Sequence, residues 1–577
     1  MDTRTPDIGF LPTTVKEMKG LGWAQADVIL VSGDTYIDSP HIGVSMVGRV
    51  LVRAGFRVGV IAQPDVHSAA DITRLGEPRL FWGVSAGCMD SMVANYTALG
   101  KPRRSDDLTP GGRNTRRPDR ACIAYTNLIR RHFKNTAPIV LGGVEASLRR
   151  ISHYDGWSDK VRRSVLFDAK ADLLVYGMAE QSIVELAEAL RDGRDIRGIR
   201  GLCYISKTLP EPIPAFGEAD VVLPDHPTVS RDTQAFTSMF LMFYANNNAH
   251  RGQRLLQQQD TRYLVHNPPA APLSVQELDA VYELPYTRAV HPYYAAHGKT
   301  AALETIRFSL TTHRGCYGEC RFCAIAVHQG TQVISRSHDS LLREAASFVR
   351  HPEFRGVISD VGGPTANMYA IECPRKQRKG PCRDKSCLFP SPCPSLPLNH
   401  SAQIDLLRSL ARVPGVRKVF VGSGLRYDMV AGDQAHGRRY LAQVLSQNTS
   451  GQFKIAPEHC QAHVLALMGK PGRQDLQRFL DMVQGVRGEH RLKVFVTYYL
   501  MAAHPGCTLA DMRALRDFAR QKLGMLPEQV QIFTPTPSTL STLMYHTGCD
   551  PFSGREIFVE KTVSGKMGQK KALAPKG

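Results

Sequence analysis

The sequence has few of the features that membrane and secreted proteins need. No apolar run reaches the roughly 18–20 residues of a membrane-spanning helix. The first residues, Met-Asp-Thr-Arg-Thr-Pro-Asp, contain no apolar core of a signal peptide. We therefore expect a cytoplasmic protein without a membrane partner. In that reducing compartment, the 13 cysteines favour metal binding over disulfide bonds.

Acidic residues are also scarce relative to basic ones. The chain has 53 Asp and Glu against 72 Lys and Arg, which gives a net charge of +19. A charge of this sign makes an anionic partner possible, and RNA is the obvious candidate. The same side chains would also suit an ordinary solvated surface, so charge alone leaves the partner open.

Strand and helix patterns alternate in two parts of this 577-residue chain, which is too long for one hydrophobic core. Apolar strands separated by helical stretches predict a doubly wound parallel sheet, Rossmann-like and similar to a cobalamin-binding domain, over residues 1–215. A second series over 301–550, whose strands each end in a polar or glycine-rich turn, is typical of a barrel. We expect 216–300 to be a connector and 551–577 to be a basic, flexible tail.

Three cysteines stand close together after the strand-like run 305–312. Cys316, Cys320 and Cys323 have a C-x3-C-x2-C spacing. Three thiolates from one loop suit a 4Fe–4S cluster with one iron left open, whereas ordinary clusters of this kind take four cysteines. The alternative is zinc, with His313 or His328 as a fourth ligand, although zinc sites usually use paired ligand groups.

The C-x3-C-x2-C run, with Phe322 before its last cysteine, resembles the signature of radical S-adenosylmethionine enzymes. Together with residues 33–38, 360–369, 454–459 and 533–540, it resembles the YgiQ-type radical-SAM proteins, a family without an assigned reaction. The resemblance implies a partial (β/α)6 barrel, a 4Fe–4S cluster and S-adenosylmethionine. It also implies reductive cleavage to a 5′-deoxyadenosyl radical, which abstracts hydrogen from a substrate, and a reductant such as flavodoxin or ferredoxin.

The resemblance also indicates which residues bind the cofactor. The glycine-rich turn Gly362-Gly363-Pro364 corresponds to the motif that binds the methionine amino group, although a simple tight turn would have the same composition. Ser423 and Arg426 follow another predicted strand, where they could contact the ribose hydroxyls and the cofactor carboxylate. The alternative for Arg426 is a surface salt bridge with Asp428.

A catalytic residue is not identifiable from spacing. Lys454, Glu458 and His459 end one predicted strand, and Tyr498, His504 and Cys507 lie late in the barrel. The first three could bind substrate or cofactor, or simply cap the helix that follows, and one of the last three could donate hydrogen or hold substrate.

A second cysteine group consists of Cys373, Cys382, Cys387 and Cys393, spaced C-x8-C-x4-C-x5-C. This insertion, 373–393, is rich in proline, lysine and arginine and has little apolar content, so it cannot fold on hydrophobic burial alone. A metal centre would hold it together, either a second iron–sulfur cluster or a structural zinc.

Cobalamin is a further cofactor to consider, because some radical-SAM enzymes bind it on a similar N-terminal sheet. Those that use a histidine ligand carry a D-x-H-x-x-G motif, and the residues around His41, Ser39-Pro-His-Ile-Gly-Val44, lack both its Asp and its Gly. We therefore do not expect cobalamin here.

The main hypothesis is an enzyme that performs radical-SAM chemistry on an unknown substrate. The basic charge and the accessory domain favour RNA or protein as that substrate. The alternative is a non-catalytic iron–sulfur or zinc protein that binds nucleic acid or carries electrons. That alternative gives no reason for Gly362 and Gly363, or for a barrel pattern after the cysteine loop.

Overall fold

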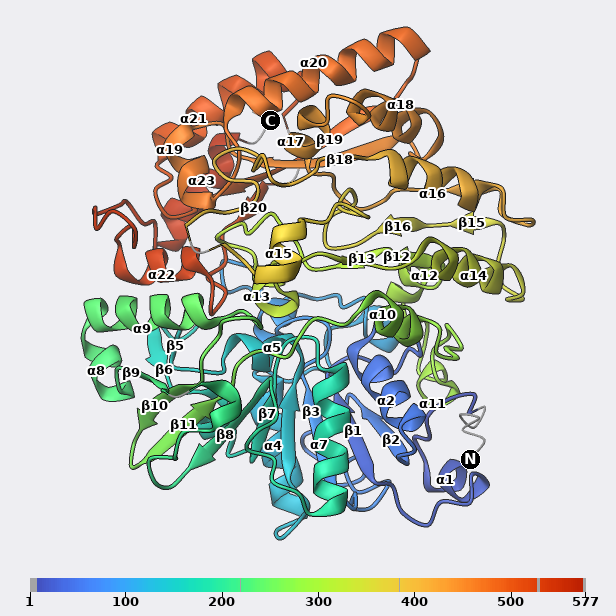
Figure 1. Ribbon diagram of the computed structural model, residues 1–577, viewed down its shortest axis with the longest axis vertical. Helices are drawn as coiled ribbons and strands as arrows, with labels where there is room; N and C mark the ends of the chain where they lie inside the picture. Colours follow the sequence, from blue (N-terminus) through green and yellow to red (C-terminus); the bar gives the residue numbers. More distant parts are fainter. Residues whose placement is uncertain (1–7, 218, 383, 527–529, 574–577) are drawn as a thin grey trace. The chain divides into compact units, whose positions relative to one another are not determined.

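The computed structural model describes residues 8–217, 219–382, 384–526 and 530–573. The chain forms two compact units, and one short segment from within the sequence range of the first belongs to the second. Figure 1 shows the helices and strands in the colours of the sequence. The first unit comprises Met1–Pro272 and Ala280–Arg307, and the second comprises Leu273–Asp279 and Phe308–Gly577. Among the helices of the described residues, none is both long and apolar enough to span a membrane.

A nine-stranded mixed sheet forms the centre of the first unit, in the order β2-β1-β3-β4-β7-β8-β11-β10-β9. The strands are β1 (Val28–Ser32), β2 (Val58–Ala62), β3 (Phe81–Ser85), β4 (Ile139–Gly142), β7 (Leu173–Val175), β8 (Leu202–Ser206), β9 (Val221–Leu223), β10 (Leu255–Gln259) and β11 (Arg262–His266). The part from β2 to β7 is parallel, and β1 and β2 are buried along their whole length, as predicted for strands covered on both faces. The predicted parallel sheet is thus confirmed from β2 to β7, and beyond β7 the sheet becomes mixed, because β8 and β11 run antiparallel to their neighbours.

The prediction that 216–300 is a connector is wrong, since β9, β10 and β11 extend this sheet. The polar run in β10 concealed the strand. Gln257 and Gln259 are buried, but their amides are satisfied: Gln259 Nε2 donates to Gln257 Oε1 at 2.9 Å, and backbone amides donate to both side-chain oxygens. Buried amides with such partners are tolerated in a strand that looks polar in sequence.

Helix α1 precedes the first strand, and the other helices of the first unit lie between these strands in the sequence or follow them. They are α1 (Val15–Gly20), α2 (Gly43–Arg53), α3 (Ser91–Asn95), α4 (Ala121–His132), α5 (Gly143–Leu148), α6 (Val165–Ala169), α7 (Glu180–Asp192), α8 (His226–Arg231), α9 (Thr233–Asn246), α11 (Pro292–Ala295) and α12 (Ala302–Ile306), and a hairpin of β5 (His153–Asp155) and β6 (Lys160–Arg162) accompanies them. Helix α10 (Val275–Tyr282) contains the residues at which the chain passes between the two units.

The second unit is built on short parallel strands. They are β12 (Ser309–Thr311), β15 (Val357–Ile358), β16 (Asp360–Gly362), β17 (Lys418–Val419), β18 (Gln452–Glu458), β19 (Phe495–Ala502) and β20 (Val530–Ile532). β12 pairs with β16, β15 with β17, and β18 with β19, which in turn pairs with β20. A parallel bridge from Leu425 to Ile455 connects the segment after β17 to β18. This is the partial (β/α)6 barrel that the sequence predicted.

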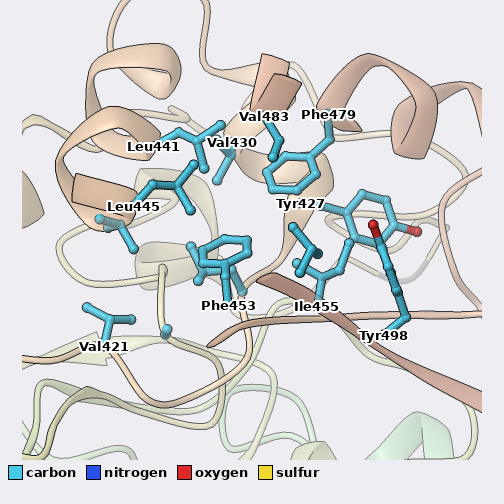
Figure 2. Packing of buried hydrophobic residues seen from close by; sticks show 14 of the residues in the cluster. Val421, Tyr427, Val430, Leu441, Leu445, Phe453, Ile455, Phe479, Val483 and Tyr498 are labelled. Carbon is cyan, nitrogen blue, oxygen red and sulfur yellow. The ribbon is translucent and has the colours of Figure 1, made fainter. Parts of the chain in front are cut away.

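Helices alternate with the strands of this barrel. They are α13 (Ala324–Gln329), α14 (His338–Val349), α15 (Pro374–Lys379), α16 (Ser401–Ala411), α17 (Tyr427–Gly432), α18 (Gly437–Gln447), α19 (Ala462–Met468), α20 (Arg473–His490), α21 (Leu509–Phe518), α22 (Leu540–Thr547) and α23 (Val563–Leu573). Figure 2 shows how Phe453 and Ile455 of β18 pack against apolar side chains of α17, α18 and α20. The Phe453 ring stacks on the Phe479 ring at 6.2 Å between centroids. This core fixes the position of β18, whose end carries Glu458.

The tail differs from its prediction as a flexible segment, because residues 563–573 form α23, which packs against α21 and β20. Leu573 is fully buried, and the Gln569 side chain accepts from Ala503 N and donates to Cys507 O, both at 2.8 Å. The lysines and glycines of this segment form no apolar helical pattern, so the sequence did not indicate α23. Its ordered position depends instead on the contacts of Gln569 and Leu573. Residues 574–577 of the predicted tail lie outside the described part.

Candidate functional site

The first cysteine group and the glycine-rich turn follow two strands that lie side by side. β12 and β16 pair in parallel, with Leu310 opposite Val361 and Thr311 opposite Gly362. Parallel neighbours end at the same edge of a sheet, which is where barrels carry their chemistry. The residues from Gly362 onward and the loop that follows β12 therefore meet at this edge.

A two-stranded ladder holds the ends of the cysteine loop together. β13 (His313–Arg314) pairs antiparallel with β14 (Ile334–Ser335), and the loop between them runs into α13. Gly315 has φ +78°, and a Cβ there would lie 1.9 Å from Gln332 O, so only glycine fits. Within the loop, Arg321 N donates to Met468 O at 2.9 Å. The ladder thus closes the loop at its two ends, and Arg321 connects its middle to the last residue of α19.

Two sulfurs of this loop face the same space. Gly318 N donates to Cys316 Sγ at 3.4 Å, and a Cβ built on Gly318 would lie 3.2 Å from Cys316 Sγ and 3.6 Å from Cys320 Sγ. Burial raises the pKa of Cys316 to about 11 and that of Cys323 to about 12. A metal centre that takes these sulfurs as thiolates must therefore displace their protons.

Arg426 lies against the same space. Its guanidinium donates to both carboxylate oxygens of Asp428, at 2.9 and 2.6 Å, and Nη1 donates to Cys320 Sγ at 3.4 Å. Burial alone would lower the pKa of Arg426, but Asp428, Cys320 and Cys316 together outweigh this effect, so the pKa is raised. The predicted salt bridge with Asp428 exists, although it is buried rather than at the surface. Arg426 is a permanent cation beside a cysteine sulfur.

Asp360 organises the loop that carries Ser423. Its carboxylate accepts from Gly422 N at 2.8 Å, from Ser423 N at 3.2 Å and from the Ser423 hydroxyl. A Cβ on Gly362 would lie 3.4 Å from Ser423 Cβ and Oγ. A Cβ on Gly363 would lie 2.6 Å from His313 Cε1. The structure thus brings Gly362, Gly363 and Ser423 together, with Pro364 next in the same turn.

Several of the remaining predicted residues are buried near one another or near His504. Phe322 packs edge-on against the His504 ring, at 6.2 Å between centroids. His459 Nε2 and Cys507 Sγ are 3.6 Å apart, and burial lowers the pKa of His459 to about 4 and raises that of Cys507 to about 12. Glu458 is buried with φ +66°, and burial raises its pKa against the opposing effect of Lys470.

Tyr498 contributes to the hydrophobic core, as Figure 2 shows, and this placement favours a structural role. Lys454 lies in β18, where its carbonyl accepts from Leu425 N at 3.2 Å.

The second cysteine group surrounds one pocket. Cys373, Cys382, Cys387 and Cys393 all line it, and its cavity volume is only about 10 Å³. Arg375, Lys376 and Lys385 also line this pocket, so it is basic. In the described part of the chain, no three His, Cys, Asp or Glu side chains are already arranged to hold a metal ion. The cysteines of the first group thus share one loop, and those of the second group share one pocket.

Two contributors were not identifiable from the sequence. Glu319 is bonded to Lys376 Nζ at 3.1 Å, and Tyr317 accepts from Cys373 N at 3.3 Å, so the first cysteine loop contacts the second group. A local sequence motif cannot predict contacts between segments this far apart in the chain. The role of Asp360 was hidden in the same way, although its place before two glycines was a signal that could have been used.

At the carboxyl ends of the first unit's sheet, glycines again allow close packing. A Cβ on Gly33 would lie 2.1 Å from Ala86 O, and Asp34 is buried with its carboxylate 2.5 Å from Arg117 Nη2. His41 shares a 3.3 Å contact between Nδ1 and Ser39 Oγ. These contacts leave the expectation about cobalamin untested.

Comparison with known proteins identifies relatives along the whole chain. A family model described as "Radical SAM N-terminal" matches residues 10–309. A UPF0313 protein of Fusobacterium nucleatum is 50% identical over 568 residues, which cover 98% of this chain and 99% of the relative. UPF0313 proteins of Methanocella arvoryzae and Thermotoga maritima are 48% and 46% identical, over 95% and 98% of this chain and 90% and 99% of theirs.

Solved structures with a similar trace are more distant. The radical S-adenosylmethionine methyltransferase TsrM from Kitasatospora setae, with tryptophan substrate and a SAM analog bound, is 16% identical with a TM-score of 0.46, over 88% of this chain and 74% of that one. The cobalamin-dependent S-adenosylmethionine radical enzyme OxsB, with aqua-cobalamin and S-adenosylmethionine bound, is 13% identical with a TM-score of 0.48, over 89% and 54%.

Proposed function

The chain belongs to the UPF0313 family of YgiQ-type proteins, and we propose that it is a radical S-adenosylmethionine enzyme. One observation carries the proposal: the C-x3-C-x2-C loop and the Gly362-Gly363 turn follow adjacent parallel strands of a partial barrel. A loop with three thiols and a glycine-rich turn at one edge is what a cluster with an open iron and an amino-acid cofactor would need.

The residues at this edge fit a 4Fe–4S cluster. Cys316 and Cys320 turn their sulfurs toward one space beside Gly318, and Cys323 ends the same loop. These three thiolates would hold three irons, and S-adenosylmethionine would take the fourth. When bound, the cluster and S-adenosylmethionine supply a 5′-deoxyadenosyl radical after one electron arrives from a reductant such as flavodoxin or ferredoxin.

The protein's part is to position and shield the cofactor. Arg426 places a positive charge beside Cys320, which offsets the negative charge of ligated thiolates. Gly362 and Gly363 leave the backbone free of side chains, so its carbonyls can approach the methionine amino group. Pro364 restricts that turn, and Phe322 covers the loop on the side of His504.

Ser423 has a role that is compatible with its bond to Asp360. A hydroxyl that donates to a carboxylate can still accept hydrogen bonds from a ribose hydroxyl. Asp360 would then set the direction of the Ser423 oxygen, and the loop 422–424 would present it to the cofactor.

The substrate belongs to the same proposal. The net charge of +19 supports an anionic macromolecule, so RNA is the first substrate class to test and a protein the second. We place the enzyme in the cytoplasm, where flavodoxin or ferredoxin would reach it and where thiols stay reduced.

Anaerobic reconstitution with iron and sulfide tests this proposal. After reduction and addition of S-adenosylmethionine, the wild-type protein should form 5′-deoxyadenosine, and so should Cys549→Ala, which removes a cysteine outside both groups. Cys320→Ala should lose both the cluster and the product. Product formation by Cys320→Ala would overturn the proposal. A fully loaded wild-type cluster that gives no product, with or without RNA and protein candidates, would favour a non-catalytic electron carrier or nucleic-acid-binding protein.

A further inference from the structure

We propose that Cys373, Cys382, Cys387 and Cys393 bind a second iron–sulfur cluster, separate from that of the first cysteine group. All four line one pocket, although they are spread along an insertion with little regular structure beyond the short helix α15. Four cysteines are the usual ligand set of a cluster that keeps no open iron. This inference concerns a metal site of its own and does not require the first group to be catalytic.

Cationic side chains are bonded to two of these sulfurs. Arg375 donates a hydrogen bond to Cys382 Sγ, and Lys376 Nζ donates to Cys387 Sγ at 3.3 Å. Lys376 is only 2% exposed, which is unusual for a lysine, and its Nζ also donates to the Glu319 carboxylate at 3.1 Å and to Thr331 O at 2.7 Å. Ligated thiolates carry net negative charge, and hydrogen bonds to their sulfurs stabilise the cluster and tune its potential.

Hydrophobic packing holds part of the insertion 373–393 in place. Cys373 and Cys387 are buried in a small hydrophobic cluster with Tyr317, Met368, Ile371, Leu388 and Leu396. A cluster of this size is modest for a segment that is otherwise rich in lysine, arginine and proline. A metal centre would contribute the remaining stability, as it does in other small metal-held segments.

The two cysteine groups are neighbours. Cys316 of the first group packs against the same hydrophobic cluster as Cys373, Cys387 and Cys393. Lys376 Nζ connects them directly, because it donates to Glu319 Oε1 of the first loop at 3.1 Å as well as to Cys387 Sγ. Tyr317 and Lys376 thus contact residues of both cysteine groups or of the loops that carry them.

The spacing favours a cluster over a single zinc ion. Structural zinc sites usually take two ligand pairs, each with two to four residues between its members. Only Cys382 and Cys387 form such a pair, with four residues between them, because Cys373 and Cys393 are separated from their neighbours by eight and five residues.

Metal analysis of cysteine variants tests the inference with a readout that needs no activity. Each protein is reconstituted without oxygen, and iron, zinc and sulfide are counted on the same sample. The wild type should hold about eight irons, in two 4Fe–4S clusters. Cys320→Ala and the double variant C382S/C393S should each hold about four, and Cys549→Ala should match the wild type.

Electron paramagnetic resonance of the reduced samples identifies which centre remains. The C382S/C393S sample should keep a signal that S-adenosylmethionine alters, because that centre has an open iron. The Cys320→Ala sample should keep a signal that S-adenosylmethionine leaves unchanged. Lys376→Met, which leaves all four cysteines in place, should lower the iron retained at the second group at least twofold after desalting.

Two results would overturn the inference. One zinc per chain that disappears in C382S/C393S would make this group a zinc site. Equal iron in the wild type and C382S/C393S, with both proteins folded by circular dichroism, would mean that the four cysteines bind no cluster. A second cluster in a protein that never cleaves S-adenosylmethionine would refute the proposed enzyme and leave this site standing.

Discussion

Arg426 and Asp428 form a buried ion pair that places a positive charge next to the Cys320 sulfur. The Asp428 side chain is fully buried, and it is the strongest partner of a guanidinium that also contacts Cys320. Asp428 therefore offsets the cost of burying the Arg426 charge and holds the guanidinium in place.

We expect Asp428→Asn to destabilise the protein by about 3–5 kcal/mol, because removing one partner of a buried pair leaves the other charge uncompensated. Urea denaturation measures this change. Asp405→Asn, which alters an exposed aspartate of α16, should change stability by less than about 0.5 kcal/mol. Equal midpoints for Asp428→Asn and wild type would show that Arg426 does not depend on this partner.

His504 predicts a dependence of stability on pH. Burial lowers its pKa to about 3, and the neutral ring donates from Nδ1 to Pro505 O at 2.8 Å and accepts at Nε2 from Ser541 Oγ at 2.7 Å. The unfolded chain binds a proton near the ordinary histidine pKa of 6.5, whereas the folded chain does not until about pH 3. Stability from this residue is complete above 6.5 and is lost as the pH falls.

Denaturation at two pH values checks this sign. Between about pH 7.5 and pH 5, His504 should account for a loss of about 2 kcal/mol, which His504→Gln should remove from the difference. His490→Gln, at an exposed position, should keep the wild-type difference. A wild-type difference that survives in His504→Gln would assign the effect to other buried groups.

At this scale, spacing predicted the residues that follow strands, namely the three cysteines and the glycine pair. It could not predict that the Ser423 hydroxyl is bonded to Asp360, or that Lys376 reaches Glu319. Those contacts join residues from different loops, and only the packed barrel brings them together. The chemistry of single residues was visible in the sequence, whereas their partners were not.

Among the elements, those with long apolar strands were predictable and those with polar sequences were not. β1 and β2 have continuous apolar runs that indicate buried parallel strands. β10 has a glutamine run that hides a strand in the interior, and α23 has three lysines and two glycines in eleven residues. In both cases, side-chain hydrogen bonds to distant residues replace the hydrophobic pattern as the source of order.

Helix α23 offers a test of that explanation. Gln569→Ala removes one donor and one acceptor that serve Cys507 O and Ala503 N, so two buried backbone groups lose their partners. We expect a loss of about 1–3 kcal/mol in the free energy of unfolding. Lys570→Ala, at the exposed neighbouring position, should be nearly neutral. Hydrogen exchange at α23 should rise in the first variant alone, and unchanged protection there would contradict the proposed attachment.

For the whole molecule, the charge of +19 makes a prediction about partners. We expect the protein to bind RNA with an affinity that falls more than tenfold between about 50 and 200 mM salt, because binding releases counterions from the phosphates. Fluorescence anisotropy with a labelled RNA hairpin measures it. Polyglutamate of equal charge is the control, and equal affinity for both polymers would mean that charge alone, and no recognition of RNA, is responsible.

One short segment of the second unit, Leu273–Asp279, is translated before the first unit is complete, and this has a consequence for the protein's synthesis. The chain completes most of the first unit by Pro272, contributes Leu273–Asp279 to the second, and returns with Ala280–Arg307. On the ribosome, domains generally fold from the N-terminus as they emerge. Here the first unit must wait for residues up to Arg307, and seven residues of the second remain without their partners until translation has passed residue 308. Premature termination anywhere between them would release a nascent chain with one unit unfinished and the other barely begun.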